Sequence, residues 1–373
     1  KAKVGSGRFS TGVTFVDINN DNFLNIYVCN SGVSSDKAKR RANQLYINQQ
    51  DGTFKDLAKE YGVNDPNFST HATFFDYDKD GDLDLYILNY SIDFRGDISK
   101  RGNLTNNELK KFSGRMLENK GGKFKDVTRN AGLLHYGYGL GVVASDINND
   151  GWTDLYIAND FTIPDKLFIN NRDKTFGDEV SSFFKHVPWF SMGVDVADIN
   201  NDGLLDIGAL DMAAADHVRG KLFMSSMDPK NFYYLVNKLN YPYQYMFNSL
   251  QINNGNNTFS NIANLSGVAK TDWSWAPLFA DFNNDGLKDY FVGNGFRKMF
   301  GDNDFQIRLK KAKKEGNLNR TEREKLYKSM PEVKLPNKLF INKGNLKFYD
   351  MGNAEGLNEK SFSSGTAYGD LDN

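Results

Sequence analysis

Residues 71–89 read HATFFDYDKDGDLDLYILN, and the chain repeats this pattern along its length. In each copy an apolar run enters a loop of alternating acidic residues, and a second apolar run leaves it. The other complete copies are residues 12–30 (GVTFVDINNDNFLNIYVCN), 141–159 (GVVASDINNDGWTDLYIAN), 193–211 (GVDVADINNDGLLDIGALD) and 276–294 (APLFADFNNDGLKDYFVGN). A sixth copy begins at Gly365 and contains Asp370. Self-similarity at intervals of roughly 50 to 90 residues is typical of proteins built from repeated units.

A second repeated element follows each acidic loop. It consists of a short apolar run, a polar turn and a run that begins with Phe, as in NQLYINQQDGTFKDL from Asn43. The other copies begin at Gly114, Asp165, Asn248 and Asn337. This is the signature of a β-hairpin, so each repeat supplies about four short strands.

A single four-stranded sheet cannot bury both of its faces, so the repeats must pack on one another. We therefore predict an all-β fold, a β-propeller of four-stranded blades with five complete acidic-loop repeats in residues 1–373. The chain is expected to be one propeller domain or most of one, and a fragment of a longer protein. A linear β-solenoid is the alternative, although solenoid coils are shorter and more even.

Three insertions, at about residues 91–112, 212–246 and 296–336, interrupt the repeats with short helical segments. Each follows the strand that leaves an acidic loop, so we expect all three at the ends of the sheets away from the loops. The stretch 306–330 is basic and helical in pattern, with a break at Gly316 and a capping box formed by Thr321 and Glu324. A solvated helical hairpin is favoured over a nucleic-acid patch, because the stretch lacks interleaved aromatic residues.

The acidic loops follow the pattern D-x-[DN]-x-D-G-x-x-[DN], and we number them 1 to 5 in chain order. Side-chain oxygens at alternating positions can surround a cation of the size of Ca²⁺, and the carbonyl of the seventh residue can add a ligand. The sequence therefore predicts about five structural Ca²⁺ sites. Their expected ligands are Asp17, Asn19, Asp21, Phe23 and Asn25 in loop 1; Asp76, Asp78, Asp80, Asp82 and Asp84 in loop 2; Asp146, Asn148, Asp150, Trp152 and Asp154 in loop 3; Asp198, Asn200, Asp202, Leu204 and Asp206 in loop 4; and Asp281, Asn283, Asp285, Leu287 and Asp289 in loop 5.

The ninth position of each loop begins a strand, where Asp is an unfavourable residue. Metal ligation explains its recurrence, whereas an Asx-turn hairpin without metal is the alternative for any single loop. Loop 2 has the most aspartates and is expected to bind most tightly. Loop 1 ends on Asn25 and has Asn22 in place of the usual Gly, so it is expected to bind most weakly.

With these loops the chain resembles the FG-GAP and VCBS repeat family, which includes the integrin α-chain propellers. The resemblance implies Ca²⁺ at the same loop positions. Residues 155–171, 190–212 and 272–296 are also similar to large bacterial VCBS proteins that carry an ASPIC/UnbV region. That resemblance implies about seven blades in the intact protein. It also implies an exported, lipid-anchored protein on the outer membrane of Bacteroidetes.

Composition and motifs favour a binding module over an enzyme. The net charge is −1, so no overall field attracts nucleic acid or a membrane, and the single cysteine, Cys29, cannot form an internal disulfide. The four histidines have no metal-ligand spacing, and the chain has no nucleophile elbow, P-loop or dinucleotide fingerprint. We expect membrane contact only through an anchor outside this sequence.

The function predicted from the sequence is that of a cell-surface propeller that binds a protein partner, with a subunit of an outer-membrane assembly as one form of it. A carbohydrate-binding propeller and a Ca²⁺-dependent polysaccharide-degrading enzyme are the alternatives. The candidate partner-binding residues, for which blade packing is the competing role, are Tyr90, Asp160, Asp211, Tyr241, Tyr243 and Trp275. Residues before the loops differ from blade to blade (His71, Tyr138, Met192 and Trp275), which argues against a repeated lectin site.

Overall fold

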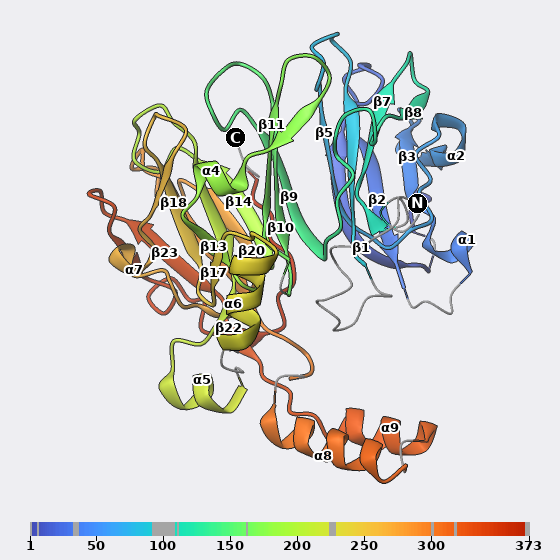
Figure 1. Ribbon diagram of the computed structural model, residues 1–373. Helices are drawn as coiled ribbons and strands as arrows, with labels where there is room; N and C mark the ends of the chain where they lie inside the picture. The colour runs from blue at the N-terminus through green and yellow to red at the C-terminus, as the bar shows by residue number, and fades with distance from the viewer. Residues whose placement is uncertain are drawn as a thin grey trace. The chain divides into compact units, whose positions relative to one another are not determined.

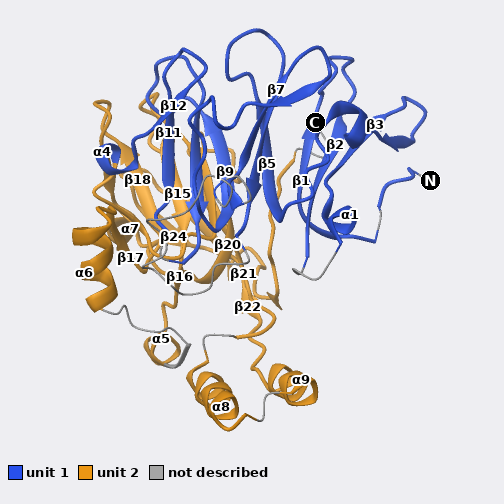
Figure 2. Ribbon diagram, turned by 45° about the vertical axis from the view of Figure 1, so that its right-hand side comes forward, with its two compact units in different colours: residues 1–183 blue, residues 184–373 orange. Residues whose placement is uncertain are grey.

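The computed structural model describes residues 2–369 except 6, 33–36, 92–108, 110–111, 162, 224–228, 300–301 and 317–318. The chain divides into two compact units, Lys1–Phe183 and Phe184–Asn373 (Figure 2). Most of the predicted insertion at 91–112, and Asp370 of the sixth repeat, lie outside the described residues.

Unit 1 consists of three four-stranded antiparallel sheets whose strand order follows the chain (Figure 1). The first contains β1 (Phe9–Val16), β2 (Asn25–Ser31), β3 (Gln44–Asn48) and β4 (Phe54–Asp56). The second contains β5 (Ser69–Phe75), β6 (Asp84–Asn89), β7 (Arg115–Asn119) and β8 (Phe124–Asp126). The third contains β9 (Gly139–Ser145), β10 (Asp154–Asn159), β11 (Lys166–Asn170) and β12 (Phe176–Asp178). The short helices α1 (Ala38–Arg41) and α2 (Ala58–Tyr61) connect strands of these sheets, and α4 (Val180–Phe183) follows β12.

Unit 2 contains one four-stranded and one five-stranded sheet built on the same strand order. One is formed by β14 (Gly193–Ala197), β15 (Asp206–Leu210), β18 (Ser249–Asn253) and β19 (Phe259–Asn261). The other is formed by β20 (Asp272–Ala280), β21 (Asp289–Asn294), β23 (Lys338–Asn342) and β24 (Phe348–Asp350), with β16 (Met212–Ala213) as a fifth strand beside β20. Two-stranded sheets join β13 (His186–Pro188) to β17 (Tyr243–Tyr245) and β22 (Leu335–Pro336) to β25 (Lys360–Ser361). The predicted all-β fold of four-stranded propeller blades is confirmed.

The core of unit 1 lies between successive sheets. One cluster joins Tyr86 and Met116 of the second sheet to Leu155 and Phe168 of the third. All residues of β6 and of β10 are buried, because neighbouring sheets cover both faces of these strands. Cys29 on β2 is buried as a small apolar side chain.

The first strands of neighbouring sheets approach one another closely. In unit 1, Thr14 Oγ1 donates to Ala72 O at 2.8 Å, and Thr70 Oγ1 donates to Gly139 O at 2.8 Å. In unit 2, a Cβ placed on Gly193 would lie 2.2 Å from Trp275 O. Blade contact therefore requires glycine at this position, since the opposing atom belongs to the backbone.

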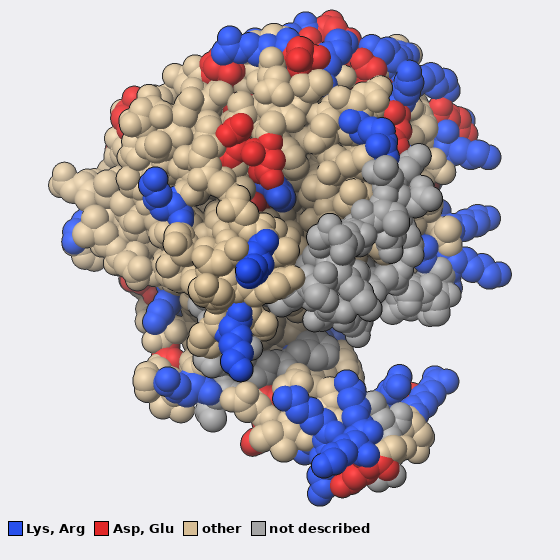
Figure 3. Space-filling view, viewed as in Figure 1, with Lys and Arg blue, Asp and Glu red and all other residues tan. Residues whose placement is uncertain are grey.

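The insertions of unit 2 leave from the strand ends that lie opposite the acidic loops, as the strand directions predict. The first follows β15 and β16 and forms α5 (His217–Phe223) and α6 (Pro229–Lys238). The second follows β21 and forms α8 (Asn303–Lys314) and α9 (Arg320–Lys328), while α7 (Ala263–Ser266) is a single turn after β19. Lys and Arg side chains gather over α8 and α9 at the bottom of Figure 3. None of the described helices is both long and apolar enough to cross a membrane.

The predicted helical hairpin is present, but its capping residue differs from the expectation. The Asn319 side chain accepts a hydrogen bond from the Glu322 N–H at 2.9 Å, so α9 begins before Thr321. The prediction of a capping box at Thr321 and Glu324 was therefore wrong. Asn is a favoured N-cap residue, and here it starts the helix two residues earlier.

Gly193→Ala is expected to destabilise the protein by about 2 kcal/mol, because the new methyl group would overlap the backbone of β20. The matched control is Gly220→Ala in α5, where an added Cβ meets no atom within 4 Å. Alanine there should be neutral or stabilising by up to about 1 kcal/mol. Denaturant unfolding of both variants measures the difference, and equal stabilities would contradict the close strand approach.

Candidate metal sites

Each acidic loop is held by the same hydrogen bonds from its own backbone. In loop 3, Asp146 Oδ1 accepts from Asp150 N–H at 2.9 Å, and Oδ2 accepts from Gly151 N–H at 2.7 Å. Asp150 Oδ1 in turn accepts from Trp152 N–H at 2.8 Å. The first-position bonds recur at Asp17, Asp76, Asp198 and Asp281. The loops therefore fold their side-chain oxygens inward by local bonding alone.

The sixth position of every loop has a left-handed backbone. Gly fills it in loops 2 to 5, as at Gly151 with φ 86°, whereas Asn22 in loop 1 has φ 66°. Asn tolerates this region better than other residues with a Cβ, so loop 1 keeps the same turn without glycine.

The ninth residue of each loop is buried and connects two parts of its sheet. Asp154 Oδ2 accepts from Ile147 N–H in the loop at 3.0 Å, and Oδ1 accepts from Asn170 N–H on the third strand at 2.8 Å. The corresponding carboxylates, with the same two kinds of bond, are Asp84, Asp206 and Asp289. All four are essentially inaccessible to solvent.

Burial sets the electrostatic state of these carboxyl groups. Loss of hydration raises the pKa of Asp84 and Asp154 to about 7 and the pKa of Asp206 to about 6, although backbone N–H donors oppose the shift. The pKa of Asp289 is also raised by burial. A buried carboxylate is disfavoured unless a positive charge lies nearby, and a bound cation is one such charge.

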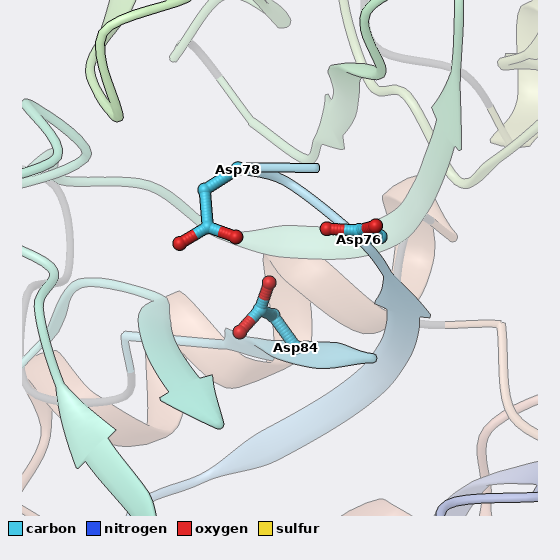
Figure 4. Close-up of side chains that lie close together, drawn as sticks. All are labelled: Asp76, Asp78 and Asp84. Carbon is cyan, nitrogen blue, oxygen red and sulfur yellow. The ribbon is translucent and has the colours of Figure 1, made fainter. Parts of the chain in front are cut away.

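Loop 2 has the most acidic cluster. One carboxylate oxygen from each of Asp76, Asp78 and Asp84 lies within 4.8 Å of the others, and the three side chains converge from the loop and the start of β6 (Figure 4). Asp78 Oδ1 and Asp82 Oδ1 are buried and have no hydrogen-bond partner among the residues that the structure describes. Converging carboxylates with two such unsatisfied oxygens beside them fit a hard divalent cation. The residues of loop 2 could therefore hold a metal ion.

Loop 1 differs at the residue that closes it. Asn25 Oδ1 accepts from Asn48 N–H at 2.9 Å, as the carboxylates do in the other loops. Its Nδ2, however, donates to Asn19 Oδ1 at 3.2 Å. An amide nitrogen cannot ligate a cation, so loop 1 offers one side-chain oxygen fewer than loops 3 to 5.

Comparison with known proteins agrees with this repeated loop. A model of the FG-GAP-like repeat matches residues 31–87, 146–209 and 235–292. The chain belongs to the FG-GAP-like repeat family. No curated protein gives a significant match to the chain.

Several solved structures share low similarity with this FG-GAP-like repeat protein. An Agrocybe aegerita lectin that recognises non-reducing terminal N-acetylglucosamine is 13% identical with a TM-score of 0.41, and the match covers 90% of this chain and 64% of that one. A rhamnogalacturonan lyase of Bacillus licheniformis is 14% identical with a TM-score of 0.34, with coverages of 77% and 55%. The V. cholerae biofilm matrix protein Bap1 is 14% identical with a TM-score of 0.27, with coverages of 60% and 34%. The chain thus spans less than two thirds of each of these proteins.

The FG-GAP-like repeats also contain a structural residue that the sequence analysis missed. Asn170, at the end of β11, donates through Nδ2 to Tyr77 O at 2.9 Å and to Thr153 O at 3.3 Å. Its Oδ1 accepts from Arg172 N–H at 2.9 Å. The equivalent residues are Asn48, Asn119, Asn253 and Asn342. The signal was present in the sequence, as an Asn that ends the apolar run of every second element.

The seventh-position residues take part through their N–H groups. Those of Phe23, Asp82, Trp152, Leu204 and Leu287 donate to the fifth-position Asp at 2.8 to 3.3 Å. Their carbonyls as metal ligands remain a prediction.

Among the candidate partner-binding residues, Asp211 is part of the scaffold. Its side chain is fully buried and accepts from the N–H groups of Trp189 at 2.8 Å and Phe190 at 3.2 Å. Burial raises the pKa of Asp211 to about 6. This carboxylate thus ties the entry of β14 to the end of β15.

The other five candidates differ in exposure. Tyr90 is half-buried against Tyr138, with ring centroids 5.3 Å apart, and Asp160 is buried and accepts from Phe161 N–H. Trp275 is half-buried and donates from Nε1 to Gly295 O at 2.8 Å. Tyr241 is half-buried, and Tyr243 on β17 is 50% exposed. Tyr243 is therefore the candidate that presents most of its side chain to a partner.

Asn170→Ala is expected to cost about 2 kcal/mol of stability, because it leaves the buried carbonyl of Tyr77 and the partly buried carbonyl of Thr153 without their donor. The neighbouring Asn171→Ala is the control. Asn171 is exposed and its Nδ2 contacts only Thr175 Oγ1, at 3.0 Å, among the bonds found for it. Its loss should change the unfolding free energy by less than about 0.5 kcal/mol. A similarly small effect at Asn170 would show that its hydrogen bond to Tyr77 O of the neighbouring sheet contributes little to stability.

Proposed function

We propose that this chain is a calcium-stabilised extracellular β-propeller that acts as a protein-binding module. The observation that carries the proposal is the fivefold recurrence of one loop geometry, which folds side-chain oxygens inward and ends on a buried residue. Local bonding recurs even where the surrounding residues differ. A shared ligand explains that recurrence more simply than five independent turns do.

Calcium fits the loops better than a smaller ion does. The available donors are carboxylate and amide oxygens at alternating positions of a flexible loop, the donor set that Ca²⁺ prefers. In our proposal the ion is structural, because it supplies the positive charge that the buried ninth-position carboxylates lack. Loops 2 to 5 are the main sites, and loop 1 is the weakest for want of an oxygen at Asn25.

A binding role is supported over catalysis by how the carboxylates are used. The aspartates of the loops accept hydrogen bonds from the backbone that shapes them, and Asp211 does so at the opposite strand ends. These groups are already engaged in holding the scaffold. The insertion at about residues 212–246 has an aromatic surface, where Tyr233 is 64%, Tyr243 50% and Tyr245 37% exposed. Such a surface suits a protein partner.

The location belongs to the same proposal. An extracellular or cell-surface protein agrees with membership in the FG-GAP-like repeat family. The finer placement, as a lipoprotein subunit of an outer-membrane assembly in Bacteroidetes, is supported only by the resemblance of residues 155–171, 190–212 and 272–296 to bacterial VCBS proteins.

Removal of calcium should lower the melting temperature. Each site held at about a hundred times its Kd contributes about 2.7 kcal/mol, so several sites together should shift the melt by well over 5 °C. Calorimetric melts in millimolar Ca²⁺ and in chelator test this. The same melting temperature in both would overturn the calcium proposal.

Asn25→Asp tests the proposed weakness of loop 1 as a calcium site. It replaces the Nδ2 donor of loop 1 with a carboxylate oxygen, and the chain keeps its other loops unchanged. Calcium binding measured by equilibrium dialysis should increase, by up to one ion per chain. An unchanged binding curve would show that the closing residue does not control the site.

The partner is tested with the intact protein, captured in mild detergent in the presence of calcium and again in chelator. A stoichiometric protein partner that dissociates in chelator is expected. Tyr243→Ser should abolish capture, whereas Tyr349→Ser, at a residue that is 55% exposed on β24, should not. Recovery of the protein alone would contradict the proposal and lead to assays of glycan binding and glycan turnover.

A further inference from the structure

The third position of loop 2 differs from that of the other loops. In loops 1, 3, 4 and 5 this residue is Asn, and its Nδ2 donates to Oδ2 of the fifth-position Asp at 2.9 to 3.0 Å. Asn therefore supplies one donor to the loop and keeps one oxygen as an acceptor. Loop 2 has Asp78 instead, which adds a negative charge and has no N–H to donate.

Lys174 supplies what Asp78 lacks. Its Nζ contacts Asp78 Oδ2, and the same ammonium lies 3.3 Å from Glu118 Oε1. The Asp78 side chain is fully buried, and its other oxygen, Oδ1, has no hydrogen-bond partner in the described part of the chain. Asp78 thus divides its oxygens between an ammonium and the acidic cluster that Figure 4 shows. The charges of Asp78 and Lys174 cancel, so the pair is neutral, as the single Asn is in the other loops.

Lys174 extends toward loop 2 from a tight turn of the neighbouring sheet. Lys174 lies in the turn between β11 and β12, with a left-handed φ of 68°. Gly52, Asn257 and Leu346, at the same position in three other hairpins, have φ values of 77°, 59° and 59°. Gly and Asn are the residues that favour this region, whereas Lys does not. From this turn, Lys174 reaches Asp78 in the loop of the neighbouring sheet.

We propose that Lys174 is a built-in counter-charge for loop 2, which stabilises this loop without metal and lowers its affinity for divalent cations. The inference rests on the proposed calcium function. Loop 2 has five aspartates, yet one of them is already paired, so its affinity does not rise in proportion to its charge. A bound cation must share Asp78 with the ammonium and is repelled by it. Solvent screening limits the size of this repulsion, because the Lys174 side chain is 53% exposed.

Lys174→Met tests the proposal, since methionine keeps an unbranched apolar stem and removes the charge. Hydrogen exchange of the full chain, followed by mass spectrometry over a calcium titration, reports each loop through its own peptides. The calcium concentration that half-protects residues 76–84 should fall by about threefold to tenfold, the scale expected for a partly exposed ion pair acting on a divalent ion. The peptides of loops 4 and 5 should not change, and in chelator the variant should exchange faster at loop 2.

Lys120→Met is the matched control. Lys120 is 51% exposed and contacts Glu118 at 2.7 Å, so the variant removes the same charge from the same side of the loop. It should shift loop 2 by less than about twofold, because Lys120 contacts Glu118 and acts on the loop aspartates only from a distance, where solvent screens its charge. In the Asp78→Asn background, Lys174→Met should likewise have little effect, because the coupling requires both members of the pair.

The outcomes separate this inference from the calcium proposal. If no loop gains protection at any calcium concentration, the calcium function is wrong and the inference is wrong with it. If loops 4 and 5 respond while the loop 2 midpoint in Lys174→Met is unchanged or higher, calcium binds but Lys174 is not a restraining charge. An equal shift in Lys120→Met would also overturn the inference, since it would show a general charge effect.

Discussion

The carboxylate that begins the second strand of a blade holds three parts of that blade together. Asp154 shows the arrangement, since one oxygen accepts from the loop at Ile147 and the other from the third strand at Asn170. Two backbone donors fix the loop against the sheet, while burial makes the negative charge unfavourable. The same group therefore stabilises the hairpin through hydrogen bonds and creates a need for positive charge. The loop oxygens lie where a cation could meet that need.

The contacts between sheets follow from the same strands. Within unit 1, Asn170 on the third strand of its sheet donates a hydrogen bond to Tyr77 O in the loop of the neighbouring sheet. Lys79 Nζ of that loop lies 4.7 Å from the ring centroid of Trp152. Within unit 2, Asn342 donates to Ile199 O, and Asn201 donates to Gly286 O in the next loop, both at 2.9 Å. A change in one loop thus reaches the adjacent sheet through polar contacts of one or two side chains. The apolar clusters between sheets add stability that does not depend on the state of the loops.

Much of the fold could be predicted from the sequence because the blades depend on local patterns. Short β-branched and aromatic runs, turns at fixed offsets and the Asp at the start of each second strand all act within about twenty residues of one another. The sequence also indicated the two helices of the basic hairpin, although Asn319 rather than Thr321 caps the second. The inward-facing oxygens of the loops were predictable for the same reason, since Asp146 is held by backbone groups four and five residues away.

What the sequence could not provide are contacts between residues that are distant along the chain. Lys174 lies 96 residues from Asp78, and no pattern in either segment indicates that they meet. The burial of Asp211 against Trp189 and Phe190 was hidden for the same reason, and an apparent surface carboxylate proves to be part of the scaffold. Counting aspartates in a loop therefore measures its charge but not its affinity. The affinity also depends on which oxygens are already bound, and in loop 2 one of them is held by a lysine from another sheet. If the loops bind calcium as proposed, similar loops on similar blades would for this reason respond to different calcium concentrations without any change in the ligand pattern itself.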